Sequence, residues 1–149
     1  MQIKRLLLAT DFSPQARHAL GYAAELSARL DVPLLLVAAF QIPSYPLPEG
    51  AIIASQDTIA KLLEHTSRDL AAEVKHATEL GAKGVDSVVI EGVAALEIVR
   101  LAKERSIDLI VMGSHGRGGL SRAILGSVAD RVMRSAHCPV MIVTQTDDA

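Results

Sequence analysis

Apolar residues follow two alternating patterns along this chain of 149 residues, and the alternation predicts its architecture. Near-continuous aliphatic runs, typical of strands buried on both faces, cover 3–9, 34–40, 86–90, 108–112 and 139–144. Between them, apolar residues recur at helical spacing in 14–30, 55–80, 95–106 and 125–136. Such alternation forces parallel strand pairing, so we expect an α/β fold: a five-stranded parallel sheet of order 3-2-1-4-5, with helices on both faces.

Two stretches fall outside this alternation. Residues 41–54 hold three of the six prolines plus Gly50, which predicts a surface loop and a place for specialised function. We expect residues 144–149 to form a flexible tail. Since the chain shows no repeat, linker or low-complexity segment, we expect residues 1–149 to form a single domain.

A glycine-rich loop follows the fourth predicted strand. It begins at Gly113, closes on Gly126-Ser127 before an amphipathic helix, and carries five of the chain's ten glycines when both ends are counted. Backbone N–H groups at a helix N-terminus are unpaired, and glycine lets an anion approach them without a Cβ in the way. This order of strand, loop and helix predicts a phosphate site, although a plain glycine turn would give a similar pattern.

Two familiar phosphate motifs do not fit this loop. A Walker A loop needs Gly-Lys-Ser/Thr, and no lysine lies here. The dinucleotide fingerprint fails too, because Gly116-x-Gly118-x-x reaches Ser121 instead of a third glycine. The start of the last helix stays open between Ser121 and Gly126. The phosphate interpretation needs the later start, since only the first turn exposes free N–H groups.

Composition narrows the classes of partner. The formal net charge is −2, so no basic excess indicates nucleic acid or an anionic membrane as partner. One cysteine excludes an intramolecular disulfide and favours a reducing, cytoplasmic setting. The apolar start of the chain is interpreted as a strand and not a signal peptide, and no uncharged apolar run approaches the ~18 residues of a membrane span.

The combined motifs resemble the ATP-binding class of the universal stress protein family. The resemblance lies in Gly113-Ser-His-Gly116, nine residues, then Gly126-Ser127, with Cys138-Pro139-Val140 in the last strand. Leu8-Ala-Thr-Asp-Phe-Ser13 and the run from Asp108 to Gly113 match the same family. This resemblance implies a Rossmann-like fold of the adenine nucleotide alpha hydrolase type, with ATP as ligand and Mg or Mn accompanying it.

The resemblance also implies residue roles. Ala9 and Thr10 would line adenine and ribose, Asp11 would bind the ribose or a phosphate-bound metal, and Ala38 would lie against adenine. The loop and the following helix start would surround the phosphates through Met112, Gly113, His115, Gly116, Gly126, Ser127 and Val128. Arg117 is a candidate phosphate cation that comes from the residues alone, because the loop has no lysine.

Plainer roles compete with some of these. Asp11 could be a helix-proximal cap, and Arg117 a solvated loop charge. His115 is interpreted as a neighbour of backbone or phosphate and not as a catalyst, since no nucleophile accompanies it. Cys138 is interpreted as a packed turn residue. We expect no metal site made by the protein alone and no catalytic residue.

The last strand predicts a partner. In the order 3-2-1-4-5 it is an edge, and its sequence Pro139, Val140, Met141, Ile142, Val143 is apolar on both faces. An open apolar edge invites aggregation unless it is covered. We therefore expect a homodimer through this strand, which the family resemblance also implies.

Three functional classes remain. The first is a regulatory stress-response protein in which ATP tunes dimer or partner contacts. The second is a slow ATP hydrolase or phosphotransferase, and the third an interaction module with a vestigial pocket. The intact glycine spacing argues against the third, and the lack of a clear general base or cation cluster argues against a fast form of the second.

Overall fold

The computed structural model describes residues 1–116 and 124–145. Its strands are β1 (Leu6–Ala9), β2 (Pro33–Phe40), β3 (Ser44–Leu47), β4 (Gly50–Ile53), β5 (Lys83–Glu91), β6 (Leu109–Gly113) and β7 (Val140–Val143). Its helices are α1 (Pro14–Leu30), α2 (Gln56–Glu79), α3 (Ala94–Glu104) and α4 (Ser127–Ser135). None of these described helices combines the length and the apolar composition that crossing a membrane requires.

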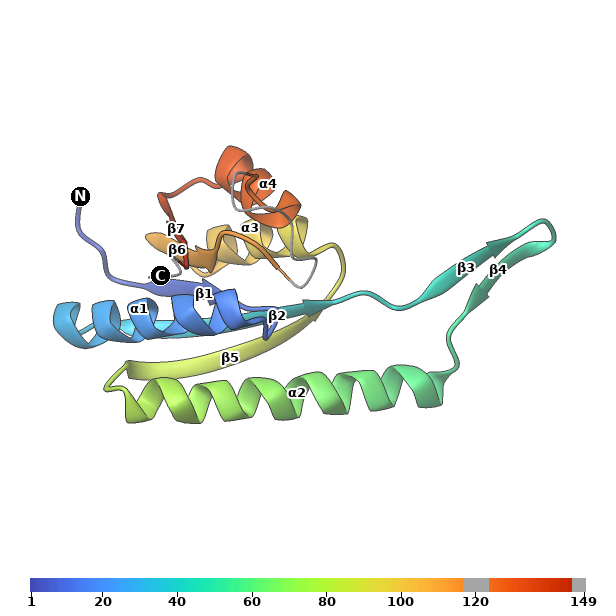
Figure 1. Cartoon of the computed structure of the whole chain (residues 1–149), viewed down its shortest axis with the longest axis horizontal. Coiled ribbons are helices and arrows are strands. Elements are labelled where there is room, and N and C mark those ends of the chain that lie inside the picture. The colour runs from blue at the N-terminus through green and yellow to red at the C-terminus, as the bar shows by residue number, and fades with distance from the viewer. Residues whose placement is uncertain (117–123, 146–149) are drawn as a thin grey trace.

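A five-stranded parallel sheet forms the centre of the molecule (Figure 1). Its order is β5-β2-β1-β6-β7, which is the predicted order once the two strands of a separate hairpin are left out. β1 is shorter than predicted and begins at Leu6, whereas β5 is longer and begins at Lys83. The predicted fold class is confirmed.

Helices cover both faces of this sheet, and alternate residues of each strand face opposite layers. Leu6 and Leu8 pack in the cluster beneath α1 and α2, while Leu7 and Ala9 pack in the cluster beneath α3 and α4. All three leucines of β1 are fully buried. This two-sided burial explains why the strands are continuous apolar runs and not alternating ones.

Helix starts follow their capping residues. The Ser13 hydroxyl accepts the N–H of Ala16 at 3.1 Å, and Pro14 occupies the first turn of α1. Ser55 caps α2 in the same way through Thr58. The open question about the last helix is settled for the later start, because α4 begins at Ser127 with Gly126 as its N-cap.

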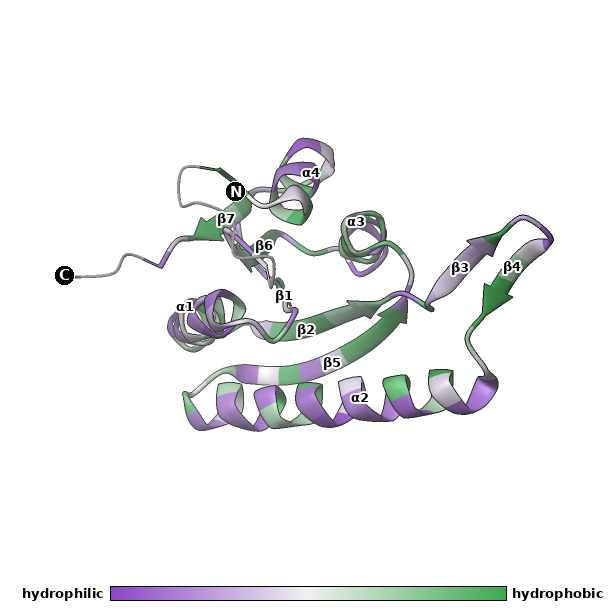
Figure 2. Cartoon of the chain, turned by 45° about the vertical axis from the view of Figure 1, so that its right-hand side comes forward, coloured by the Kyte–Doolittle hydropathy of each residue, from purple (hydrophilic) through white to green (hydrophobic). Residues whose placement is uncertain are grey.

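The prediction of a surface loop over 41–54 was wrong. This segment folds into an antiparallel hairpin of β3 and β4 that extends away from the body (Figures 1 and 2). Pro46 makes the first strand look like a loop in the sequence. Proline is nevertheless tolerated in a strand at a position where the main-chain N–H would face outward. The predicted flexible tail falls largely on 146–149, which lie outside the described residues.

Candidate functional site

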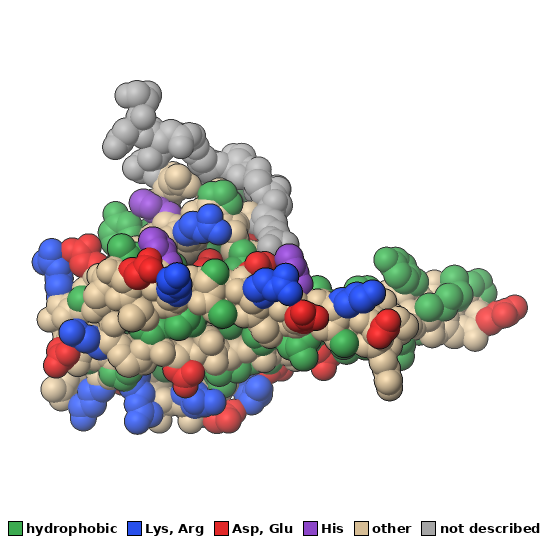
Figure 3. All heavy atoms as spheres, turned by 90° about the horizontal axis from the view of Figure 1, so that it is seen from below, with side chains coloured by type: hydrophobic (Ala, Val, Ile, Leu, Met, Phe, Trp, Pro, Cys, Tyr) green, Lys and Arg blue, Asp and Glu red, His purple; other side chains and the backbone are tan. Residues whose placement is uncertain are grey.

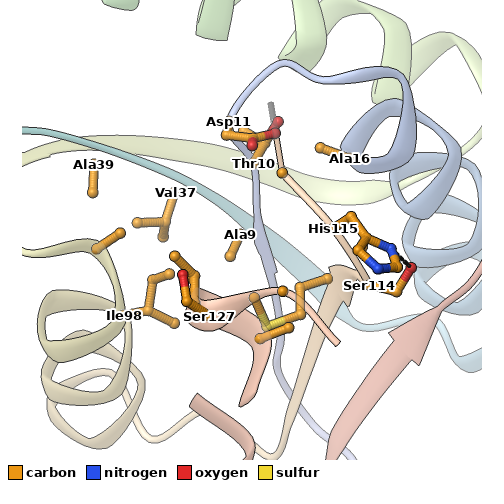
Figure 4. Close-up of a pocket in the computed structure, with 17 residues that line it drawn as sticks. Ala9, Thr10, Asp11, Ala16, Val37, Ala39, Ile98, Ser114, His115 and Ser127 are labelled. Carbon is orange, nitrogen blue, oxygen red and sulfur yellow. Dashed lines mark hydrogen bonds between the residues drawn. The ribbon is translucent and has the colours of Figure 1, made fainter. Parts of the chain in front are cut away.

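A pocket of about 300 Å³ opens at the carboxyl ends of the strands, where the order reverses between β1 and β6 (Figure 4). Open α/β sheets bind ligands at this point. Residues from the glycine loop and from the loop between β1 and α1 meet there. Ten predicted site residues line it: Ala9, Thr10, Asp11, Met112, Gly113, His115, Gly116, Gly126, Ser127 and Val128.

The loop between β1 and α1 is folded tightly by its own side chains. Thr10 Oγ1 accepts the N–H of Phe12 at 3.1 Å, and Asp11 Oδ1 accepts the N–H of Ser13 at 3.0 Å. Phe12 adopts φ 65°, a left-handed conformation that is costly for a bulky residue. Asp11 therefore does have the cap-like role that competed with ligand binding, while its carboxylate still lines the pocket.

Glycines let the second loop approach the first. A Cβ on Gly116 would stand 2.5 Å from Asp11 Oδ2, and a Cβ on Gly113 would stand 3.1 Å from the carbonyl carbon and oxygen of Gln15. The first distance is shorter than real Cβ contacts allow, and the second leaves little room. These two positions explain why the spacing Gly113-x-x-Gly116 follows β6.

The first turn of α4 faces the pocket. Gly126 has no side chain to cap the helix, so Ser127, Val128 and Ala129 carry first-turn N–H groups without a capping hydrogen bond. The expectation that Gly126 offers its own N–H to a phosphate needs correcting. That N–H donates to the Ser114 carbonyl at 2.7 Å, so it is engaged within the chain and holds the start of α4 against the loop.

His115 spans the described ends of the glycine loop. Its Nε2 lies within hydrogen-bond reach of the Ile124 carbonyl. Nδ1 lies 2.9 Å from the Ser114 hydroxyl, which donates to it in the neutral ring. Both ring nitrogens are thus occupied, and this supports the interpretation of His115 as a backbone neighbour and not as a general base.

The other half of the pocket is apolar. Val37 and Ala39 from β2, Ile98 from α3 and Ala9 from β1 lie together there (Figure 4). Ala94 of α3 also lines the pocket. Sequence reasoning missed Ala94 and Ile98. The apolar stripe of α3 was a usable signal, but the stripe alone does not separate residues that pack on the sheet from those that line a cavity.

The placement of Ala38 needs correcting. It is fully buried in the cluster beneath α1 and α2, on the face of the sheet opposite the pocket. Because side chains alternate along a strand, its neighbours Val37 and Ala39 line the pocket instead. Arg117, the candidate phosphate cation, lies outside the described residues.

The described lining is poor in charge. Asp11 is its one carboxylate, and none of the described lining residues is Lys or Arg. Over the described ranges, no group of three His, Cys, Asp or Glu side chains is arranged to hold a metal ion. The pocket therefore offers an apolar slot at one end and main-chain donors with one carboxylate at the other.

Two predicted features lie away from the pocket. Cys138 is half-buried against the core beneath α3 and α4, where burial raises the pKa of its thiol, in keeping with a packed turn residue.

β7 is an edge strand, but its side chains face their own core: Val143 is buried, and Val140, Met141 and Ile142 are half-buried. Pro139 is exposed. On its outer side, β7 has no neighbouring strand in the described sheet, so its main-chain groups there are available for pairing.

Comparison with known proteins establishes the family. The chain matches the universal stress protein family over residues 2–144, and it belongs to that family. Universal stress protein MJ0531 of Methanocaldococcus jannaschii is 35% identical over 142 residues, which cover 94% of this chain and 81% of that protein.

Solved structures share the fold. UspA from Lactobacillus plantarum superimposes with a TM-score of 0.81 at 22% identity, over 96% of this chain and 99% of that one. A universal stress protein solved in complex with cAMP gives a TM-score of 0.74 at 22% identity, over 98% of this chain and all of that one. At identities of 22%, these two structures show that the fold is shared.

Proposed function

We propose that this protein binds ATP in the pocket between β1 and β6 and acts as a nucleotide-dependent regulatory dimer in the stress response. The observation that carries the proposal is the division of the pocket into two halves. The slot between β2 and α3 has the apolar character that a purine base needs, and the uncapped start of α4 offers N–H donors to phosphates.

In this proposal, the apolar half of the pocket holds the base of the nucleotide and the other half holds its phosphates. Val37, Ala39 and Ile98 would enclose the base, while Ser127 and Val128 would donate main-chain N–H groups, and Ser127 its hydroxyl, to phosphate oxygens. Asp11 lines the same pocket and would accept hydrogen bonds from ribose hydroxyls. That a protein of the same fold was solved with cAMP agrees with an adenine nucleotide as ligand.

A metal ion fits this site only as a companion of the nucleotide. Mg²⁺ and Mn²⁺ accept one or two protein carboxylates together with phosphate oxygens, and Asp11 supplies one carboxylate. Asp11 would hold such an ion, which would neutralise phosphate charge. The chain's own contribution is to position the phosphates on the main chain.

Regulation suits this pocket better than catalysis. Both nitrogens of His115 are engaged, and the described lining residues include no Lys or Arg to stabilise charge on a transferring phosphoryl group. The pocket therefore suits retention of a triphosphate more than its cleavage. The lone thiol of Cys138 fits a reducing cytoplasm.

Dimer formation through β7 is part of this proposal. The open edge would pair with its twofold mate through main-chain hydrogen bonds, since the strand's side chains already face the core. Light scattering on the purified chain at micromolar concentration tests it. A monomeric mass contradicts the dimer.

A long incubation with ATP, assayed for ADP and preceded by a binding measurement, separates the three functional classes. Binding without ADP formation is the expected result. Binding with turnover that Asp11→Ala abolishes would identify a slow hydrolase, and no binding would identify an interaction module with a vestigial pocket. Gly21→Ala serves as control, because a Cβ there meets nothing within 4 Å.

A further inference from the structure

The hairpin of β3 and β4 projects from the body (Figure 2), and apolar side chains gather on the face of it that Figure 3 shows. All eight of its strand residues are exposed, and its only substantial packing partner among the described elements is its own other strand. Four large apolar side chains stand in solvent: Tyr45 at 67% exposure, Leu47 at 49%, Ile52 at 56% and Ile53 at 65%. An isolated two-stranded hairpin is marginally stable in water, so this one needs a partner surface.

The hydrogen-bond pattern shows which edge of the hairpin is open. The N–H of Ala54 donates to the Pro43 carbonyl at 3.2 Å, and pairs alternate along an antiparallel ladder. The pair Tyr45–Ile52 is therefore hydrogen-bonded inside the hairpin. The pairs Ser44–Ile53 and Pro46–Ala51 turn their main-chain groups outward.

The two outer edges differ in their capacity to bind another strand. On β3, Pro46 has no N–H, so Ser44 alone carries an outward donor. On β4, both Ala51 and Ile53 carry an outward N–H and an outward carbonyl. Proline thus blocks one edge and leaves β4 available for strand addition.

The sequence of β4 favours a second copy of itself as the added strand. Gly50-Ala-Ile-Ile53 has no charged residue, and the hairpin's single charge, Glu49, lies in the turn. Identical uncharged strands set no like charges opposite each other when they pair about a twofold axis. A partner protein of opposite charge would find nothing on this edge to recognise.

We propose that β4 pairs antiparallel with β4 of a second copy of this chain, which joins the two hairpins into one four-stranded sheet. A register centred on Ile52 uses every outward group, because it sets Ala51 opposite the partner's Ile53 and Ile53 opposite the partner's Ala51. Ile52 then lies directly opposite the partner's Ile52. This contact is separate from the nucleotide pocket and from the edge of β7.

Paired proline substitutions and light scattering test the edge. Ala51→Pro removes one outward N–H from each copy of β4, whereas Ser44→Pro makes the same change on the opposite edge. Ala51→Pro is expected to lower the mass relative to the wild type, to one half where β4 is the single contact, and Ser44→Pro to leave it unchanged. Because the comparison is with the wild type, it holds whether or not β7 also pairs. An unchanged mass in Ala51→Pro overturns the proposal.

A cysteine pair tests the register without weakening the contact. In a Cys138→Ser background, Ile52→Cys is expected to form a covalent dimer under mild oxidation, because the two positions face each other across the axis. Ile53→Cys is the matched control, since its copies lie diagonally, too far apart for a disulfide. Failure of Ile52→Cys to cross-link, or equal cross-linking of both, overturns the proposed register and the pairing that it defines.

Discussion

Gly116 lies so close to Asp11 that a Cβ built on the glycine would stand 2.5 Å from Oδ2 of the carboxylate. The two residues come from loops about a hundred positions apart in the chain, joined by the pairing of β1 with β6. Their contact sets the spacing between the two loops that line the pocket.

Gly116→Ala tests this spacing. The added Cβ must push Asp11 or the glycine loop away, so we expect ATP affinity to fall by about tenfold or more, a cost of about 1.4 kcal/mol. Calorimetric titration measures it. Gly21→Ala, inside α1 with nothing within 4 Å, should keep full affinity and gain about 1 kcal/mol of stability from better helix propensity. Equal affinities for the two variants would contradict the spacing argument.

Gly126→Ala should affect both stability and binding. A Cβ there would lie 3.0 Å from the Ser114 carbonyl oxygen and 3.2 Å from the Cα of His115, and both are backbone atoms that cannot rotate aside. We expect a loss of about 1–3 kcal/mol in the free energy of unfolding, together with weaker ATP binding as the start of α4 shifts. Urea unfolding with and without ATP separates the two effects. Unchanged stability would show that the loop gives way at no cost.

Neighbouring alanines of β2 test which face of the strand holds the base. Ala39→Leu fills the apolar slot and should lower ATP affinity by about tenfold or more with little loss of stability. Ala38→Gly, on the opposite face, should cost about 1 kcal/mol of stability and leave affinity unchanged. The reverse pattern in the titrations would return the base to the side of Ala38.

The burial of Glu73 makes the free energy of unfolding depend on pH. It is 5% exposed, and neither carboxylate oxygen has a hydrogen-bond partner among the described residues. Burial raises its pKa, and the nearby Thr10 side chain and Arg17 offset this only in part, while Asp11 and Asp69 add to the rise. The folded state therefore holds this proton more tightly than the unfolded state, so the free energy of unfolding falls as pH rises through the window between the two pKa values.

Replacing Glu73 with methionine removes the free-energy cost of burying a charged carboxylate. Glu73→Met should raise the free energy of unfolding by about 1–3 kcal/mol at neutral pH. The gain should shrink as pH falls through the window between the two pKa values, and it should vanish below the ordinary carboxyl pKa of about 4.3, where the group is neutral in both states. Urea unfolding across this range measures it. A gain of constant size at every pH would show that packing, and not charge, is responsible.

Much of this fold could be predicted from the pattern of apolar residues. The five buried strands predict the parallel sheet, and the predicted order makes β1 and β6 neighbours, so that Asp11 and Gly116 follow adjacent strands. The hairpin was missed because Pro43, Pro46 and Pro48 resemble loop residues. Pro46 is compatible with a strand only because its missing N–H faces outward, which depends on register.

The finer geometry of the pocket could not be predicted in the same way. The family resemblance implies Ala38 as the residue against adenine, and a continuous apolar strand such as 34–39 offers no alternation that would reveal the error of one position. Likewise, the bond from the Gly126 N–H to the Ser114 carbonyl joins two ends of one loop. Only the folded path of that loop decides whether such an N–H points to a ligand or to the chain.

Calorimetric titration of ATP into the wild-type chain and into Gly116→Val, side by side, tests the central claim most directly. The valine side chain would project towards the Asp11 carboxylate from a position where even a Cβ is too close. We predict saturable binding of one ATP per chain to the wild type and none detectable to Gly116→Val, with both proteins folded by circular dichroism. A wild-type chain that shows no ATP binding, or a valine variant that binds equally well, would contradict the proposed site.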